Sequence, residues 1–377
     1  MLALHPTLPE GQVLDARYRV DEPLGVGGHG QVYRGTQLST GRAVALKVLR
    51  PELLDDPIAV KRFEHEARFA CQLSHPNLVT YYDFGRDPEL GAMYVVMELL
   101  PGESLAEHVR ATGPMGLARV ARIVEQVGGA LHEAHEAGLV HRDVKPANLM
   151  LVREGAQGDF VKVIDFGLVK AFRAGDGQVT SLTADGVIVG SPYYLSPEQI
   201  REHGDIDGRA DVYALACTAY KLLTGLTPFR GRDPVEVATQ HLLKAPRPMG
   251  AVLANSDFPS ELEALIAEAL AKEPDERPAT ALEFARRFSE AAARAPERVV
   301  HRGHATLLDA EPPDLKPRRR PRRAAEIPTA PMAERSPVAE APTAWRPRLL
   351  KGAVALVATA LVAALALLLL KVFAGSP

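Results

Sequence analysis

Two short motifs near the middle of the chain restrict its possible folds more than any other part of the sequence. The first runs from His141 to Asn148, and the second runs from Asp165 to Gly167. Together they carry two carboxylates, an amide and the ammonium of Lys145. Carboxylate and amide oxygens hold magnesium, a carboxylate orients a hydroxyl, and an ammonium binds phosphate. Turn or helix capping would explain a single acid here but not the whole set, so the motifs predict phosphoryl-transfer chemistry.

A triphosphate also needs a cradle and a cation, and both are found earlier in the chain. The glycine-rich segment from Gly25 to Val32 lies between two strand-like stretches, as in a strand-turn-strand loop and unlike the strand-to-helix turn of a dinucleotide site. By itself this pattern also fits an ordinary glycine-rich hairpin. Lys47 ends the apolar strand segment that follows. The spacing from Gly25 to Lys47 places an ammonium where it reaches phosphate oxygens.

Strand-like segments dominate the first part of the chain and helix-like segments the later part, which predicts an α+β fold with two lobes. Apolar patterns predict strands at 43–49, 92–97 and 161–164. Helices are expected over 58–73 and from about residues 117 and 211. Two later helices are expected to begin with capping boxes, formed by Ser260 with Glu263 and by Thr280 with Glu283.

With these residues in order, the chain resembles the eukaryotic-type (Hanks-type) serine/threonine protein kinases of bacteria from about Tyr18 to Phe288. The resemblance implies the two-lobed protein-kinase fold, with an N-terminal segment at 1–17, a β-rich N-lobe at 18–98 and a helical C-lobe at 101–292. It implies ATP as the phosphate donor and Mg²⁺ as the cofactor, with Mn²⁺ as a possible substitute. The acceptors would be serine or threonine hydroxyls of proteins.

The resemblance also implies a role for each motif residue. Asp143 resembles the catalytic carboxylate that accepts or orients the proton of the substrate hydroxyl, and Asn148 and Asp165 resemble the magnesium ligands. Lys145 is similar to the lysine that contacts the γ-phosphate in serine/threonine kinases. Tyrosine kinases carry a different sequence at this place, so this small motif predicts the type of hydroxyl.

The nucleotide site is likewise assigned through the resemblance. Lys47 needs a glutamate partner on the following helix, and Glu66 aligns better with the family than Glu64, which is then an exposed charge. Met97 would be the gate beside the adenine pocket, although each apolar residue there is equally explicable as core. The implied ATP-binding residues are Gly25, Val26, Gly27, Gly28, His29, Gly30, Val32, Ala45, Lys47, Met97, Glu98, Leu100 and Met150.

A long loop between Asp165 and Glu198 carries three hydroxyl residues that predict a phosphorylation switch. Arg142, next to the catalytic aspartate, is the residue expected to bind a phosphate on this loop and so to order it. The candidate phosphosites are Thr180, Ser181 and Thr183. Glu198 and Arg277 resemble the buried ion pair that braces this loop in the family.

The C-terminal part of the chain, 293–377, differs in composition from the rest. A proline- and arginine-rich stretch at 293–348 is expected to be a disordered linker. The segment 349–371 contains an uncharged, mostly apolar run at 352–370, enough for a helix of ~28 Å that spans a membrane. Basic residues precede this span and Lys371 alone follows it, so the positive-inside rule predicts a cytoplasmic kinase domain, a single-pass helix in the inner membrane and a short external tail at 372–377.

Charge and short motifs indicate which partners to expect. The net charge of −3 gives no basic field for nucleic acid, and no nucleic-acid partner is expected. A small-residue stripe in the membrane segment is compatible with a homodimer, and Thr306 with Asp309 is compatible with a phosphothreonine-binding FHA partner. Cys71 and Cys217 are expected to be buried, reduced thiols. An inactive kinase-like membrane scaffold and a small-molecule kinase remain as competing functions.

Overall fold

The computed structural model describes residues 8–27, 30–49, 57–152, 159–166, 192–201, 206–253 and 258–295, which lie in the first of two units, 1–315 and 316–377. Several predictions fall outside these residues: the linker at 293–348 beyond residue 295, the membrane segment, the tail, the three candidate phosphosites, Gly28 and His29. Within the described part, none of the helices combines the length and the apolar character that a membrane crossing requires.

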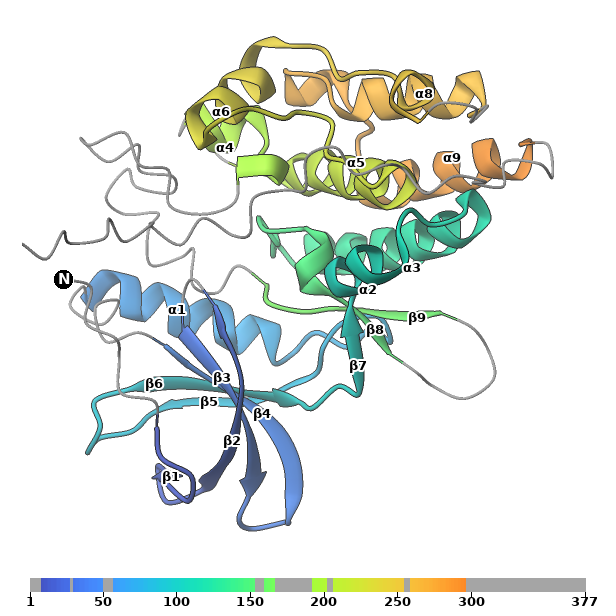
Figure 1. Ribbon diagram of the computed structural model, residues 1–377. Coiled ribbons are helices and arrows are strands. Elements are labelled where there is room, and N and C mark those ends of the chain that lie inside the picture. Colours follow the sequence, from blue (N-terminus) through green and yellow to red (C-terminus); the bar gives the residue numbers. More distant parts are fainter. Residues whose placement is uncertain are drawn as a thin grey trace, which may run out of the picture. The chain divides into compact units, whose positions relative to one another are not determined.

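The N-lobe is a six-stranded antiparallel sheet with strand order β1-β2-β3-β4-β6-β5 and one helix packed on it (Figure 1). Its sheet includes residues that precede Tyr18, because β1 pairs with β2. The elements are β1 (Val13–Leu14), β2 (Tyr18–Gly27), β3 (Gly30–Gln37), β4 (Arg42–Leu49), α1 (Pro57–Ala70), β5 (Tyr81–Arg86) and β6 (Met93–Glu98).

Alternation along the strands gives this sheet two buried faces. In β4, Ala45 and Leu49 belong to the large core that also includes residues of α1 and the helical lobe. Their neighbours Val44 and Leu46 belong to a smaller core on the other face, which also holds Leu14 and which Leu8 packs against. Lys47 shares the register of Ala45 and Leu49, so the period of two directs the lysine toward the other lobe.

The C-lobe is helical, with a small sheet of order β7-β8-β9 beside the N-lobe (Figure 1). The strands are β7 (Gly102–Ser104), β8 (Leu149–Val152) and β9 (Phe160–Val163). The helices are α2 (Leu105–Thr112), α3 (Leu117–Glu136), α4 (Pro197–Arg201), α5 (Arg209–Thr224), α6 (Pro234–Leu243), α7 (Met249–Val252), α8 (Ser260–Ala269) and α9 (Ala281–Ala293), with single 3₁₀ turns at Pro146–Asn148, Pro192–Tyr194 and Pro274–Glu276.

Helix α5 is the centre of the C-lobe core. All but two of its residues are buried, which fits its weak amphipathic pattern and its mainly apolar composition. Helix α3 lies close to α9 because Gly128 leaves room: a Cβ there would lie 2.5 Å from the Cβ of Ala285. Cys217 is buried in α5, and burial raises the pKa of its thiol. Cys71 is only half-buried, so the expectation that both thiols are buried is wrong for this one.

The three expected strands are confirmed as β4, β6 and β9, and the two capping boxes have different outcomes. Thr280 is the N-cap of α9 and accepts the N–H of Glu283, but only this half of the predicted capping box is present, because the Glu283 carboxylate accepts the N–H of Ala279, the residue before the N-cap. Ser260 is not a cap, because α8 begins at Ser260 itself and Pro259 occupies the N-cap position. Glu263 instead accepts the N–H groups of Met249 and Gly250, which begin α7.

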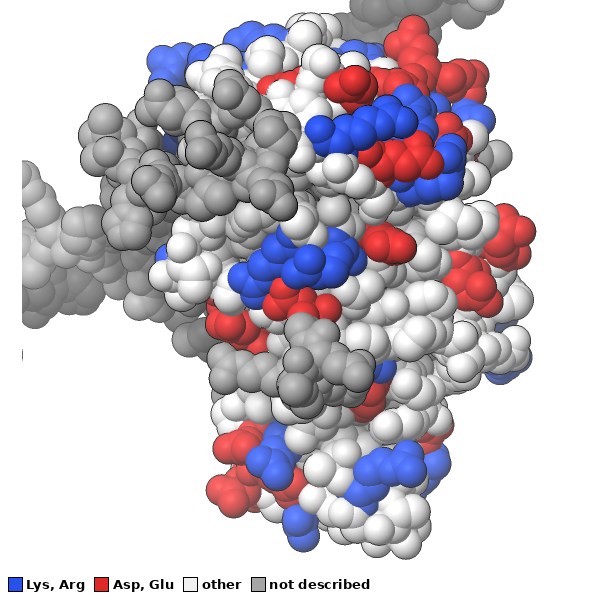
Figure 2. Space-filling view, turned by 90° about the vertical axis from the view of Figure 1, so that its right-hand side faces the viewer, with Lys and Arg blue, Asp and Glu red and all other residues white. Residues whose placement is uncertain are grey.

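Charged side chains of both signs lie next to one another on the face shown in Figure 2. Many of the described residues pair accordingly, for example Arg119 with Asp159 and Arg287 with Glu268. Both of these pairs are part-buried and joined by two hydrogen bonds, whereas exposed pairs such as Arg286 with Glu290 contribute little to stability individually.

Candidate active site

The run from His141 to Asn148 folds so that three of its polar side chains meet. One carboxylate oxygen of Asp143 accepts hydrogen bonds from Lys145 Nζ and from Asn148 Nδ2, both at 2.9 Å. Asn148 Nδ2 also donates to the carbonyl of Asp143 at 2.8 Å. Both bonds of Asn148 use the amide nitrogen, which leaves the amide oxygen as the group to meet a cation. The cluster lies at the short turn before β8.

The second acid lies across from this cluster and joins the two lobes. Lys47 Nζ of β4 contacts Asp165 Oδ1 at 2.7 Å, and the two side chains are 12% and 31% exposed. Burial by itself would raise the pKa of Asp165, but the Lys47 ammonium outweighs burial and the net pKa lies below the ordinary value. Asp165 also has a φ of +57°, a left-handed conformation that costs a non-glycine residue about 1 kcal/mol or more.

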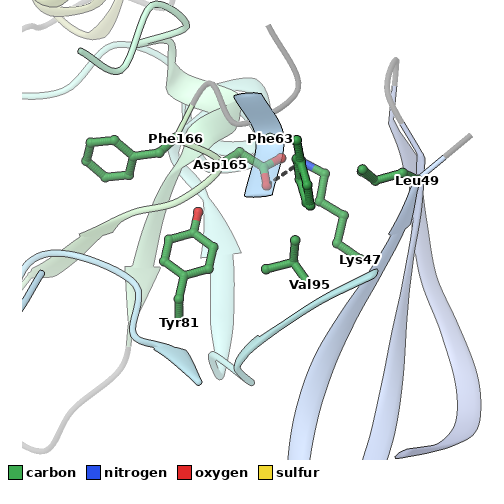
Figure 3. Close-up of a pocket in the computed structure, with 7 residues that line it drawn as sticks. All are labelled: Lys47, Leu49, Phe63, Tyr81, Val95, Asp165 and Phe166. Carbon is green, nitrogen blue, oxygen red and sulfur yellow. Dashed lines mark hydrogen bonds and ion pairs between the residues drawn. The ribbon is translucent and has the colours of Figure 1, made fainter. Parts of the chain in front are cut away.

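A small pocket opens behind this ion pair (Figure 3). It is lined by Lys47, Leu49, Phe63, Tyr81, Val95, Asp165 and Phe166. Figure 3 shows the Lys47 ammonium and the Asp165 carboxylate turned toward each other, with the Tyr81 hydroxyl below Asp165 and Phe166. The pocket is therefore mostly apolar, with three polar groups that converge on it.

Asp211, for which the sequence predicted no role, holds the run from His141 to Asn148 in place. The Asp211 carboxylate, fully buried at the start of α5, accepts the backbone N–H of His141 and of Arg142 at 2.8 and 2.7 Å, and it pairs with His135 at 2.8 Å. Burial would raise the pKa of Asp211, but hydrogen bonding and charge, His135 foremost, lower it further than burial raises it. These bonds stabilise the positive φ of Arg142, +63°.

His141 links the catalytic run to the strand before Asp165. Its Nε2 is 2.9 Å from the carbonyl of Ile164, and its Nδ1 accepts the N–H of Asp143 at 3.2 Å. The imidazole therefore carries its proton on Nε2 and connects the two motifs directly. An acid in the first turn of an otherwise apolar helix was the sequence signal that could have identified Asp211.

Residues 18–288, most of the chain, match the protein kinase domain family. The chain belongs to the protein kinase family. Curated relatives include serine/threonine-protein kinase pkn3 of Myxococcus xanthus, 42% identical over 274 residues that cover 73% of this chain and 50% of that protein. PknB of Mycolicibacterium smegmatis is 41% identical over 275 residues, 72% of this chain and 42% of that protein. The chain thus spans half or less of the length of these relatives.

Solved kinase structures have the same fold. The kinase domain of Mycobacterium tuberculosis PknI superimposes with a TM-score of 0.60 at 31% identity, covering 76% of this chain and 100% of that one. Rad53 in complex with AMP-PNP has a TM-score of 0.58 at 25% identity, covering 72% of this chain and 64% of that one. The two-lobed kinase fold expected from the sequence is confirmed.

The predicted ATP-binding residues within the described part of the chain lie on β2, β3, β4, β6 and β8 or just after β6. Gly25 of β2 pairs with Val32 of β3, and Ala45 of β4 pairs with Met97 of β6. Val26 and Gly27 end β2, Glu98 ends β6, Leu100 follows it, and Met150 lies in β8. Gly30 also has a packing role, because a Cβ there would lie 2.2 Å from the carbonyl oxygen of Val48.

The linker glutamate has a side-chain contact that the sequence did not predict. The Glu98 carboxylate accepts from Lys162 Nζ and from the N–H of Thr80, both at 2.7 Å. Lys162, largely buried in β9, also donates to the carbonyl of Leu78. This contact ties the linker between the lobes to the strand that leads to Asp165.

Glu66 lies on α1, half-buried, in the same helix as the buried residues Phe63 and Ala67. The ion pair shown for Lys47 is with Asp165, and the pairing of Lys47 with Glu66 stays a prediction.

The expected ion pair between Glu198 and Arg277 is present. Two parallel hydrogen bonds of 2.7 and 2.8 Å join the guanidinium and the carboxylate, and the Arg277 side chain is fully buried. Burial would raise the pKa of Glu198, but the hydrogen bonds and charge of Arg277 keep the pKa below its ordinary value.

Proposed function

We propose that this protein is a serine/threonine protein kinase that transfers the γ-phosphate of ATP to protein hydroxyls. The observation that carries the proposal is the convergence of Lys145 and Asn148 on one carboxylate oxygen of Asp143, beside the Lys47–Asp165 pair. An aspartate held in this way can orient a hydroxyl and accept its proton. The relatives named as serine/threonine-protein kinases support the same assignment.

The donor groups fit magnesium. Asn148 offers an amide oxygen and Asp165 a carboxylate, and hard oxygen donors of this kind suit Mg²⁺, and Mn²⁺ in its place. Magnesium, when bound, neutralises charge on the transferring phosphoryl group. The low pKa of Asp165 keeps its carboxylate ionised, and therefore ready to bind a cation, at neutral pH. Lys47, Lys145 and the loop from Gly25 to Gly30 would bind and orient the phosphates, with Glu66 positioning Lys47.

Adenine would bind between Val32 and Ala45 on one side and Met150 on the other, with backbone hydrogen bonds to Glu98 and Leu100. Met97 would limit access to the pocket behind it. Support comes from the pairing of Ala45 with Met97 and from the nucleotide analogue in the complex of Rad53, which shares this fold.

We further propose that the enzyme is switched on by phosphorylation of Thr180, Ser181 or Thr183, with Arg142 as the partner of the phosphate. The backbone of Arg142 is already fixed by Asp211 and by Gln199, whose Nε2 donates to the Arg142 carbonyl at 2.8 Å. An arginine fixed at its backbone loses less conformational entropy when it binds a phosphate.

The remaining proposals concern location and partners and rest on sequence. The segment 349–371 would be a single-pass helix of the inner membrane, with the kinase domain in the cytoplasm and residues 293–348 as its linker. Its small-residue stripe would favour a homodimer, and Thr306 would offer a phosphothreonine to an FHA domain.

The test of the function is phosphate transfer by the full chain from labelled ATP, with Asp143→Asn as the control. We expect transfer to serine and threonine residues, mapped by mass spectrometry, and its loss in the variant. Retention of full transfer by Asp143→Asn would exclude the assigned mechanism, and no transfer by the wild type despite magnesium-ATP binding would favour an inactive scaffold.

A further inference from the structure

One polar group of the pocket behind Lys47 has no task in the proposed mechanism. Tyr81 begins β5, opposite Met97 of β6, and its ring enters the pocket beside Asp165 and Phe166 (Figure 3). The two other polar side chains of the pocket, Lys47 and Asp165, satisfy each other through their ion pair.

The Tyr81 hydroxyl is buried and unpaired. The residue is 6% exposed, and its oxygen has no hydrogen-bond partner within the described part of the chain. The backbone N–H groups of Phe166 and Asp165 lie near this oxygen, but neither completes a hydrogen bond with it. A buried hydroxyl without a partner destabilises a fold, and phenylalanine would fill the same space without that loss. The hydroxyl therefore makes no full hydrogen bond in the state described.

The segment next to the hydroxyl contains Asp165, the proposed metal ligand. Asp165 is held by Lys47 and has the left-handed φ of +57°. In the proposed function both residues acquire new partners, Lys47 the phosphates and Asp165 the metal. Release of Asp165 from Lys47 in that state would remove the ion pair that now holds its side chain.

We propose that Tyr81 is a positioning residue for Asp165. In the loaded kinase its hydroxyl oxygen accepts a hydrogen bond from the backbone N–H of Asp165 or Phe166, which favours the backbone conformation in which Asp165 holds magnesium. The inference rests on the proposed function, because the metal role of Asp165 belongs to it. One hydrogen bond gained only in the loaded state corresponds to about three- to tenfold in affinity.

The test compares two tyrosine-to-phenylalanine variants of the full chain. Tyr81→Phe removes the unpaired hydroxyl. Tyr94→Phe is the matched control: Tyr94 is equally buried, belongs to the core on the other face of the sheet, and donates its hydroxyl to Asp15 at 2.9 Å. Each protein is measured by titration calorimetry with AMP-PNP, in magnesium and in EDTA, and by thermal unfolding without nucleotide.

We expect Tyr81→Phe to weaken binding of AMP-PNP three- to tenfold in magnesium and to leave binding in EDTA unchanged. Its melting temperature without nucleotide should equal or exceed that of the wild type, because an unsatisfied group has been removed. Tyr94→Phe should show the opposite pattern, a lower melting temperature with unchanged binding.

Two outcomes would overturn the inference. One is a change of less than twofold in the AMP-PNP affinity of Tyr81→Phe in magnesium. The other is a fall in the melting temperature of Tyr81→Phe as large as that of Tyr94→Phe, which would show that Tyr81 is an ordinary structural tyrosine. A wild type whose nucleotide binding does not depend on magnesium would instead contradict the proposed function itself, so the two failures are distinguishable.

Discussion

The ion pair between Glu198 and Arg277 offers the sharpest test of how this kinase domain is stabilised. Arg277 is fully buried, and its guanidinium donates both to Glu198 and to the carbonyls of Ala271, Arg209 and Lys272. In the wild type the Glu198 side chain is only 13% exposed, and Arg277→Met would leave its carboxylate without a partner. The substitution would also remove the hydrogen-bond donors to the three backbone carbonyls. Breaking a buried pair in this way costs about 3–5 kcal/mol.

For a domain of this size, that loss corresponds to a fall in melting temperature of roughly 10 °C, at ~2–4 °C per kcal/mol. The assay is thermal and urea unfolding of the wild type, Arg277→Met, and the double variant with Glu198→Gln. The double variant should recover part of the loss because it leaves no unpaired charge. Arg232→Met is the matched control, since Arg232 forms an ion pair with Glu236 while 93% exposed, and it should change stability far less than Arg277→Met.

The dependence on pH gives an independent check. Because Arg277 lowers the folded-state pKa of Glu198, the stabilisation is present above the unfolded pKa of about 4.3 and is lost as pH falls through the lower folded value. Without Arg277, burial raises the pKa of the Glu198 carboxyl above its ordinary value, so the stability difference between wild type and Arg277→Met should narrow as the pH falls from that raised pKa to the lowered pKa of the wild type. A loss for Arg277→Met no larger than that of Arg232→Met, or a difference that does not change with pH, would refute the reasoning.

Three further predictions concern other buried positions, each measured by unfolding. Gly128→Ala should destabilise by about 1–3 kcal/mol through overpacking against α9, whereas Gly129→Ala, whose Cβ meets nothing closer than 3.8 Å, should be neutral or stabilising. Lys272→Met should stabilise on the order of 1 kcal/mol at pH 7, because burial lowers the pKa of the Lys272 ammonium to about 8 and its Nζ finds no acceptor among the described residues. This gain should vanish between pH 8 and 10.5, where the wild type itself is stabilised by loss of the proton from the folded state. Asp211→Asn should cost about 1.5–3 kcal/mol and lower kcat, because the charged acceptor of the His141 and Arg142 N–H groups is lost; unchanged kcat would contradict its role.

The sequence identified side chains whose chemistry is specific and missed those whose role depends on the fold. Asp143, Asn148 and Lys47 were predicted as site residues because few roles besides phosphoryl transfer require these residue types at this spacing, and the structure joins Asp143 to Asn148 and Lys47 to Asp165. Asp211 and Lys162 are single charged residues within mainly apolar segments, so the sequence pattern does not indicate their roles. Each becomes important only when the chain folds back and brings it partners that are 70 and 64 residues away. The Glu198–Arg277 pair was predicted because the resemblance, and not periodicity, connects two positions so far apart.

Two predictions made from local sequence signals, the Ser260 cap and the burial of Cys71, were wrong. Ser260 has the spacing of a cap, but proline at the preceding position starts α8 one residue earlier, and Glu263 is used by α7 instead. Cys71 follows the last residue of α1, where the helix expected to reach residue 73 has already ended, so it is less buried than a helical position would be. Neither deviation can be read from a window of a few residues.

The small core on the outer face of the N-lobe has a practical consequence for where the domain begins. Leu14 is fully buried in this core, and Leu8 packs against the core. The N–H of Leu8 donates to the Tyr33 hydroxyl at 2.9 Å, and Asp87 accepts the N–H of Asp15. A fragment cut at Tyr18, where the family match starts, would uncover this apolar surface and unpair these groups. Expression trials of the isolated catalytic domain should therefore begin at or before residue 8, and shorter fragments should be prone to aggregation.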